Sequence, residues 1–198
     1  MLASIVDTDI RLFLWLNSHH SPFWDNIMWH ISGKVEWLPL YLILIGYIVY
    51  KYRWQSIFII AGIILCITLA DQFAAKAFKE VFQRLRPTHN PAIAELVHTV
   101  NGYRGGMYGF VSNHAANTFA IAVYLLLLFK QKWFTVGILF WAALVSYSRI
   151  YLGVHFPGDI LGGAALGSLI GWLVYFAWKV SVPYTDKILP KKKKARNG

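Results

Sequence analysis

The sequence predicts an all-α membrane protein, a bundle of five transmembrane helices preceded by amphipathic helices at the N-terminus. Of its 198 residues, 57% are hydrophobic and 17% aromatic, whereas only 14% are charged. The apolar residues come in long blocks rather than at amphipathic spacing, and a helix needs about 20 mainly apolar residues to cross a bilayer. These two observations exclude a soluble globular domain.

Five apolar blocks define the expected spans. Four of them meet or approach the required length, at residues 38–50, 56–75, 115–129 and 133–148. The fifth, 158–180, is rich in glycine and ends in Trp172, Tyr175 and Trp178. Small residues let neighbouring helices approach closely, and aromatic residues at block ends are typical of the membrane interface. We therefore expect a transmembrane domain over residues 36–182.

Residues 1–35 form a separate N-terminal segment. Two stretches in it, 4–18 and 22–33, are too short and too polar to span a bilayer comfortably. We interpret them as amphipathic helices lying at the membrane interface. The alternative is that they combine into a sixth, weakly hydrophobic span.

Basic residues predict the orientation in the membrane, because five spans place the loops alternately on two sides. One side carries eleven of the nineteen basic residues and a single acid, Asp186. These basic residues are Lys51, Arg53, Lys130, Lys132, Lys179, Lys187, Lys191, Lys192, Lys193, Lys194 and Arg196. The positive-inside rule assigns this side, with the tail 183–198, to the cytoplasm. The tail is either a topology signal or a segment that binds anionic lipids.

The opposite side also retains basic residues close to span ends, where the topology rule predicts few. They are Lys76, Lys79, Arg84, Arg86, Arg104 and Arg149. Cations kept there indicate an anionic partner. The long connection 79–113 lies on the same side, and a loop of this length is usually functional or carries short helices of its own.

The first motif on this side is KEVFQRLRP, residues 79–87. On a helix, Lys79, Gln83 and Arg86 would be spaced i, i+4 and i+7, so the two cations would share one face until Pro87 ends the helix. Two cations fixed in this way can hold a phosphate between them. Snorkelling of basic side chains to the interface explains the pattern equally well.

The second motif is YGFVSNHAANTFA, residues 108–120. Ser112 and Asn113 are both good N-cap residues for the helix that becomes the third span. A helix N-terminus offers free backbone N–H groups to an anion, and His114 would lie beside it in the first turn. A capped helix with an interfacial histidine is the alternative.

The third motif is SRIYLGVHFPGD, residues 148–159. Pro157 marks a helix start, with His155 just before it and Asp159 in its first turn. Four residues apart, the carboxylate can hold one imidazole nitrogen and leave the other free, as in the orienting pairs of nucleophiles and bases. Arg149 adds a phosphate donor. A local pair that caps the helix is the simpler alternative.

All three motifs belong to one membrane face, where ionisable groups are costly and usually functional. Their pattern, K-x6-RP, S-x-H and SR-x5-H-x3-D, resembles the phosphatidic acid phosphatase type 2 superfamily of lipid phosphate phosphatases, in its bacterial membrane-bound branch. The resemblance covers roughly residues 36–180. One motif departs from it, since this chain has VSNH where the family usually has PSGH, although Ser112 and His114 are retained.

The resemblance implies a role for each site residue. His155 attacks phosphorus and forms a phosphohistidine, Asp159 orients it, and His114 protonates the leaving oxygen and later activates water. The implied phosphate ligands are Lys79, Arg86, Ser112, Asn113 and Arg149.

No metal ion or other cofactor is expected, because the nine acids offer no shared ligand spacing. Asp159 is committed to the histidine, and Asp7, Asp9 and Asp25 lie in the N-terminal segment, apart from the motifs.

The expected activity is removal of phosphate from a lipid phosphate or pyrophosphate. By resemblance the substrates are undecaprenyl pyrophosphate, phosphatidylglycerol phosphate or the 1-phosphate of lipid A. Transfer of the phosphate to another lipid or sugar is one alternative, and a non-catalytic protein that binds or transports polyprenyl phosphates is another. We expect a bacterial inner-membrane protein with its active site on the periplasmic face, lipid partners, and neither a nucleic-acid nor a protein partner.

Overall fold

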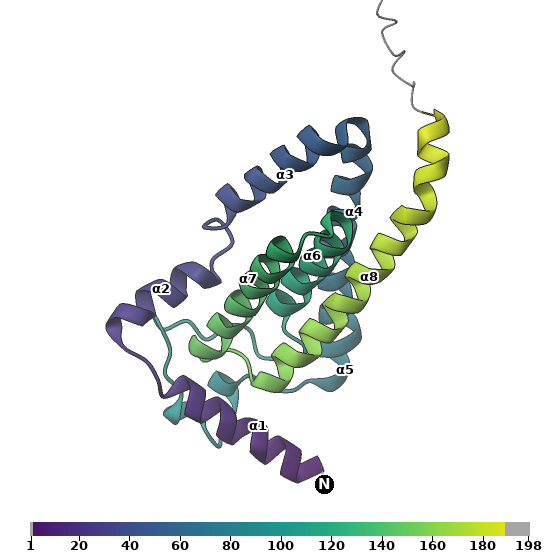
Figure 1. Cartoon of the computed structure of the whole chain (residues 1–198). Coiled ribbons are helices and arrows are strands. Elements are labelled where there is room, and N and C mark those ends of the chain that lie inside the picture. Colours follow the sequence, from purple (N-terminus) through teal and green to yellow (C-terminus); the bar gives the residue numbers. More distant parts are fainter. Residues whose placement is uncertain (1, 189–198) are drawn as a thin grey trace, which may run out of the picture.

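The protein is all-helical, as predicted, in a computed structural model that describes residues 2–188 (Figure 1). The long helices are α1 (Leu2–Asn17), α2 (Pro22–Ser32), α3 (Leu38–Tyr52), α4 (Ser56–Gln72), α6 (Asn113–Phe129), α7 (Lys132–Tyr151) and α8 (Pro157–Ile188). Within the described range no β-strand forms, and the only extended pairing is an isolated bridge between Leu85 and Tyr108. Of the predicted basic tail, residues 189–198 lie outside the described part of the chain.

The centre of the bundle is α6, which packs along α8 and also against α4 and α7. The contact with α8 is close because α8 presents glycines to α6. A Cβ added to Gly167 would collide with the carbonyl oxygen of Ala116, and one added to Gly171 with that of Ala120. The predicted role of the small residues in this block is therefore confirmed, since only glycine lets the two backbones approach so closely.

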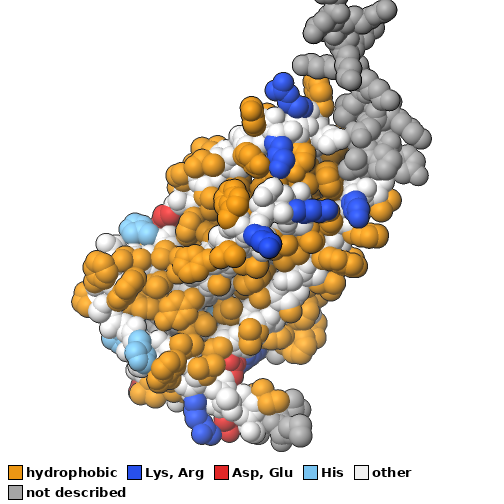
Figure 2. Space-filling view, viewed as in Figure 1, with side chains coloured by type: hydrophobic (Ala, Val, Ile, Leu, Met, Phe, Trp, Pro, Cys, Tyr) orange, Lys and Arg blue, Asp and Glu red, His pale blue; other side chains and the backbone are white. Residues whose placement is uncertain are grey.

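Membrane insertion follows from the apolar surface. Three helical stretches are long and apolar enough to cross a bilayer, Leu38–Phe82, Lys132–Tyr151 and Pro157–Ser181, and α6 is a shorter apolar helix. Large apolar side chains cover most of the face shown in Figure 2. A water-soluble protein rarely exposes so large an apolar area, so the chain is an integral membrane protein.

The stretch Leu38–Phe82 does not run straight. A short 3₁₀ turn, η1 (Arg53–Gln55), follows α3, and Arg53 adopts a positive φ of 53° there. In Figure 1, α3 rises to this turn and α4 descends from it, so the chain reverses its direction. The reversal separates the two apolar blocks that the sequence predicts as the first two spans.

The predicted helix through residues 79–87 ends early, which corrects one expectation. After α4 the chain continues as a π-helix, η2 (Phe73–Lys79), and then as a last turn, α5 (Glu80–Phe82). Gln83 then takes a left-handed conformation with φ of 46°. Arg86 precedes a proline and is therefore biased towards the extended conformation that it adopts. Lys79 and Arg86 consequently do not share a helix face.

The connection that follows carries short helices of its own, as expected. They are the 3₁₀ turns η3 (Pro87–His89) and η4 (Ala94–Leu96).

The N-terminal helices dock onto the bundle. Helix α1 packs against α7 and α8, and α2 packs against α7. Phe13 is fully buried with its ring centroid 5.2 Å from that of Phe156. The buried side chain of Asn17 donates to the carbonyl of Tyr151 at 2.8 Å and accepts from the backbone N–H of His98 at 2.8 Å. One face of α1 is thus fixed to the loops beside the bundle, while Ile5 and other apolar residues stay exposed.

Candidate active site

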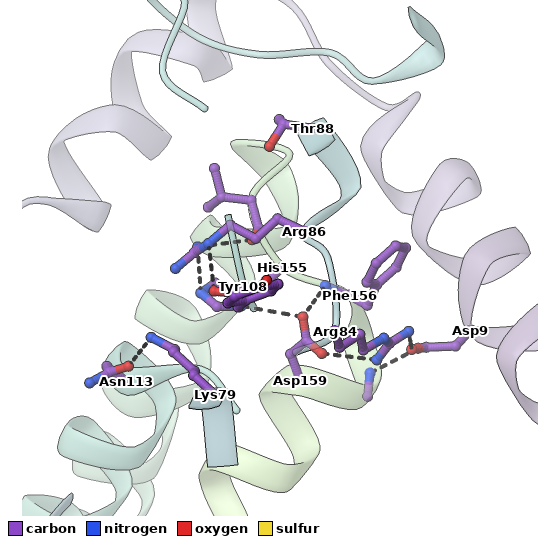
Figure 3. A network of polar contacts seen from close by, with 12 residues as sticks. Asp9, Lys79, Arg84, Arg86, Thr88, Tyr108, Asn113, His155, Phe156 and Asp159 are labelled. Carbon is purple, nitrogen blue, oxygen red and sulfur yellow. Dashed lines mark hydrogen bonds and ion pairs between the residues drawn. The ribbon is translucent and has the colours of Figure 1, made fainter. Parts of the chain in front are cut away.

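The three sequence motifs meet at one end of the bundle, where α6 and α8 begin (Figure 3). The first and third motifs touch through Arg86, whose Nη1 lies 2.9 Å from Nε2 of His155. The first and second touch through Lys79, whose ammonium donates to Oδ1 of Asn113. The second and third are joined by the backbone, because the N–H of Ser112 donates to the carbonyl of Asp159 at 3.0 Å.

His155 is held as a neutral imidazole with a defined tautomer. Its side chain is buried in the turn between α7 and α8, with only 1% of the residue exposed. Nδ1 lies 3.3 Å from Oδ2 of Asp159, and Nε2 faces the Nη1 donor of Arg86. Because a carboxylate accepts and a guanidinium donates, Nδ1 carries the proton and Nε2 has the free lone pair.

The surroundings of His155 also favour its neutral form. Burial, followed by the positive charges of Arg86, Arg149 and Lys79, lowers the pKa of His155 well below its usual value. The imidazole is therefore unprotonated at neutral pH, which is the state that a nucleophile requires.

Asp159 is fully buried and saturated with donors. Oδ2 accepts from the backbone N–H of Phe156 at 3.0 Å as well as from the imidazole, and Oδ1 accepts from Nη1 of Arg84 at 2.9 Å. Arg84 is in turn paired with Asp9 of α1, at 2.7 Å between Nη2 and Oδ2. The other oxygen of Asp9 accepts from the N–H of Gly158 at 2.8 Å.

The expectation that Asp9 lies apart from the motifs is therefore wrong. From the sequence, Arg84 is only one of several outer cations, and Asp9 has no expected role. The signal in the sequence is a second arginine, Arg84, two positions before Arg86, which can pair with an acid of its own. Nothing local links Asp9 to residues 75 positions or more away.

Two further cations face neutral partners. Arg86 donates through Nε to the carbonyl of Tyr108 at 3.2 Å and through Nη1 to that of Val154 at 3.0 Å. Arg149, only 4% exposed, donates to the hydroxyls of Ser32 and Tyr103, and its Nε has no hydrogen-bond partner among the described residues. In the described part of the chain neither guanidinium forms an ion pair, so the site keeps a net positive charge suited to a phosphate.

The start of α6 contributes unpaired donors. Ser112 occupies the N-cap position, as predicted, but its side chain makes no capping bond. Its Oγ is buried and has no hydrogen-bond partner among the described residues. Asn113, by contrast, is already engaged, because its amide also donates to Asp71 at 2.9 Å.

A cavity of about 350 Å³ opens beside Arg149 and His114. Arg149, Tyr103 and His114 line it together with residues 32–36, the stretch between α2 and α3. His114 also lines a second, largely apolar groove of about 480 Å³ between α3, α4 and α6. His114 therefore lies where the polar cavity meets the apolar groove. The described residues contain no group of three or more His, Cys, Asp or Glu side chains that could hold a metal ion.

Related proteins share this architecture. The chain is 43% identical over 179 residues to the lipid A 4′-phosphatase of Bacteroides thetaiotaomicron, a match that covers 89% of this chain and 79% of that protein. It is 38% identical over 172 residues to the lipid A 4′-phosphatase of Porphyromonas gingivalis, covering 86% of this chain and 73% of that protein.

Two crystal structures are similar in fold. LpxE of Aquifex aeolicus matches with a TM-score of 0.65 and 25% identity, over 83% of this chain and 93% of that one. The PAP2-type phosphatidylglycerolphosphate phosphatase of Bacillus subtilis also has a TM-score of 0.65, at 24% identity, over 96% of this chain and 90% of that one. The sequence model of the PAP2 superfamily matches residues 57–182, a range that contains every motif around the buried imidazole. The chain therefore belongs to the PAP2 superfamily, and it is a membrane lipid phosphatase.

Proposed function

We propose that the chain hydrolyses the phosphate monoester of a phosphorylated, acylated glucosamine lipid of the lipid A type, releasing free phosphate. The observation that carries the proposal is a buried, neutral His155 whose Nε2 lone pair faces the guanidinium of Arg86, a group that forms no ion pair with the described residues. The identity to two proteins named lipid A 4′-phosphatase supports the choice of lipid. This identity favours the 4′-phosphate over the 1-phosphate that the family resemblance implies.

The phosphate would bind among Arg86, Arg149, Lys79 and the start of α6. The unpaired hydroxyl of Ser112 and the first backbone N–H groups of α6 offer donors to its oxygens. For attack, Arg86 must exchange its contact with Nε2 for a phosphate oxygen. Substrate binding would thus free the nucleophile and neutralise the guanidinium in one step.

In the first chemical step, the Nε2 lone pair of His155 forms a bond to phosphorus as the bond to the lipid oxygen breaks. Protonated His114 gives its proton to that oxygen, so the lipid alcohol leaves uncharged. The phosphoimidazolium keeps its Nδ1 proton, and Asp159, held by Arg84, stabilises its positive charge. In the second step His114 takes a proton from water, the hydroxide attacks phosphorus, and His155 is released with free phosphate.

The position of His114 supports its role as proton donor. It lines both the cavity that Arg149 lines and the apolar groove. A lipid lying in the groove with its phosphate in the cavity would place the bridging oxygen beside this imidazole. General acids must lie within hydrogen-bonding reach of the atom they protonate.

We further propose five spans, formed by α3, α4, α6, α7 and α8, with the active site on the periplasmic face of the bacterial inner membrane. Helix α6, with 17 residues, is about 26 Å long and falls short of the hydrocarbon thickness, but its first turn begins at the recessed site. Several basic side chains gather at the opposite end of the bundle, seen at the top of Figure 2. The positive-inside rule places that end, with the tail 183–198, in the cytoplasm.

A phosphate-release panel tests the proposal. Purified enzyme would be given bis-phosphorylated lipid A, phosphatidylglycerol phosphate and undecaprenyl pyrophosphate, with the His155→Gln variant as control. Mass spectrometry of the lipid A product distinguishes loss of the 4′-phosphate from loss of the 1-phosphate. Phosphate release from one of the other two lipids but not from lipid A would refute the proposed substrate. If the lipid A phosphate is labelled, recovery of the label in a second lipid would indicate transfer in place of hydrolysis.

A further inference from the structure

Asp71 is an acid in a membrane-spanning helix that the proposed chemistry does not use. It lies near the end of α4, and its Oδ1 accepts hydrogen bonds from the side-chain amides of Asn113 and Asn117, both at 2.9 Å. An ionisable side chain within a span is costly and usually marks a functional position. Asn113 and Asn117 follow each other by one turn on α6, so the three side chains form one polar cluster beside His114.

This cluster forms the polar end of the apolar groove. The α4 side of the groove carries the isoleucines Ile60, Ile63, Ile64 and Ile67. Towards the active site its lining changes to Asp71, Asn113, Asn117 and His114. The groove can therefore take a ligand that is apolar over most of its length and polar next to the reacting phosphate.

Two acceptor atoms in the cluster have no protein partner. Oδ1 of Asn117 is buried without a hydrogen bond, and Oδ2 of Asp71 makes none to the described residues. The orientation of the Asn117 amide is fixed, because its NH₂ group must face the carboxylate of Asp71. Both positions are therefore acceptors, and a ligand that displaces water from the groove must bring N–H or O–H donors to satisfy them.

We propose that Asp71 and Asn117 form a subsite that accepts hydrogen bonds from hydroxyl or amide N–H groups of the lipid alcohol that leaves the phosphate. The inference rests on the proposed function and deepens it. An acylated amino sugar carries such donors close to its phosphate. The diacylglycerol part of phosphatidic acid carries none, because both of its other oxygens are esterified. The subsite would thus select sugar-based lipid phosphates.

A purely structural role for Asp71 predicts something different. Asp71 holds Asn113, which accepts from Lys79, so the carboxylate could serve only to position that cation. Loss of such a role would slow the reaction of every lipid phosphate equally. Asn117 separates the two roles, because its side chain bonds Asp71 and not Lys79.

The decisive measurement is a ratio of kcat/KM values, for lipid A over phosphatidic acid, in Asn117→Leu and Asp71→Asn. A hydrogen bond to the charged Asp71 accounts for about ten-fold in affinity and one to the neutral amide oxygen of Asn117 for less, so we expect the ratio to fall about ten-fold in Asp71→Asn and roughly two- to ten-fold in Asn117→Leu. Gln72→Leu is the matched control, since Gln72 is the exposed neighbour of Asp71 on α4, and it should keep the wild-type ratio. An unchanged ratio, or equal losses with both lipids, would overturn the subsite.

A binding measurement separates this inference from the proposed function. Dephosphorylated lipid A should raise the thermal unfolding midpoint of the wild-type enzyme in detergent, and diacylglycerol should raise it less. Asn117→Leu should lose that difference. If the wild-type enzyme releases phosphate from neither lipid but the difference depends on Asn117, the proposed function fails and the subsite stands. If wild type and variant respond alike, the subsite is refuted whatever the activity.

Discussion

Asp9 links the first helix to His155, the proposed nucleophile, and replacing it tests whether the N-terminal segment is part of the active site. Its carboxylate pairs with Arg84 at 2.7 Å and accepts from the N–H of Gly158 at 2.8 Å. Arg84 in turn donates to Oδ1 of Asp159, and Oδ2 of the same carboxylate faces Nδ1 of His155. In Asp9→Asn the amide can still accept from Gly158, but the charge that fixes Arg84 is lost.

The size of the effect follows from that single link. The Asp9 and Arg84 side chains are 14% and 25% exposed, so water screens their pairing only in part. Hydrogen bonds to charged groups contribute about 1.5–3 kcal/mol. Each 1.36 kcal/mol in the barrier is about ten-fold in rate. Full transmission to the transition state would lower kcat about 10- to 150-fold. Because some of the lost free energy appears as reduced stability, we expect kcat to decrease about ten-fold.

The assay is kcat and KM on a detergent-solubilised lipid phosphate, with thermal unfolding measured in parallel. Asp9 does not line the substrate cavity, so kcat should fall while KM stays near the wild-type value. Asp9→Glu should restore part of the activity by keeping the charge. Asp7→Asn is the matched control, because Asp7 is exposed on the same helix. Wild-type kcat in Asp9→Asn, or an equal decrease in Asp7→Asn, would refute the positioning role.

Four further predictions concern the nucleophile, the pH dependence, metals and topology. His155→Ala should abolish phosphate release from a protein that still folds, and turnover above background in a folded sample would end the assignment of the nucleophile. Because the folded-state pKa of His155 is lowered, the unfolded chain gains a proton below pH of about 6.5 that the folded one does not, so stability should decline as pH falls, and less steeply in His155→Gln. Turnover should persist in excess EDTA and be inhibited by vanadate, whereas loss on chelation and recovery with Mg²⁺ would contradict the phosphohistidine mechanism. In a Cys66→Ala background, an impermeant thiol reagent should label a cysteine at Asn90 but not one at Asn197 in intact cells, and the reverse would invert the topology.

Local spacing explains what could be predicted of the site. His155 and Asp159 are four residues apart across a helix start, and the structure places their side chains 3.3 Å apart at that start. Ser112 was recognised as an N-cap from its residue type and the apolar run that follows, and it occupies that position. Helices and their caps depend on residues within a turn or two of each other, so their signals are present in the sequence.

Contacts between distant segments could not be predicted. The sequence predicts Arg149 as a phosphate donor, but it does not predict the hydrogen bonds of Arg149 to Ser32 at the end of α2 and to Tyr103 in the long loop. The pairing of Asp9 with Arg84 depends on how α1 docks, which no local pattern encodes. The helix over residues 79–87 was predicted from charge spacing, but the extended bias of the residue before a proline and the left-handed Gln83 end it earlier. The proposed division at residue 35 is therefore one of sequence character, since both N-terminal helices contribute contacts to the site.

The docking of α1 has a consequence for the order in which the protein becomes active during synthesis. Helix α1 leaves the ribosome before its partners, because Arg84 is made after α4 and Gly158 only when α8 begins. Until α8 begins, the carboxylate of Asp9 lacks its contact with Gly158, and the groups that orient His155 are incomplete. A partly inserted chain would thus bind lipid phosphates poorly and hydrolyse none, so catalytic competence would arise only once the last helix has entered the membrane.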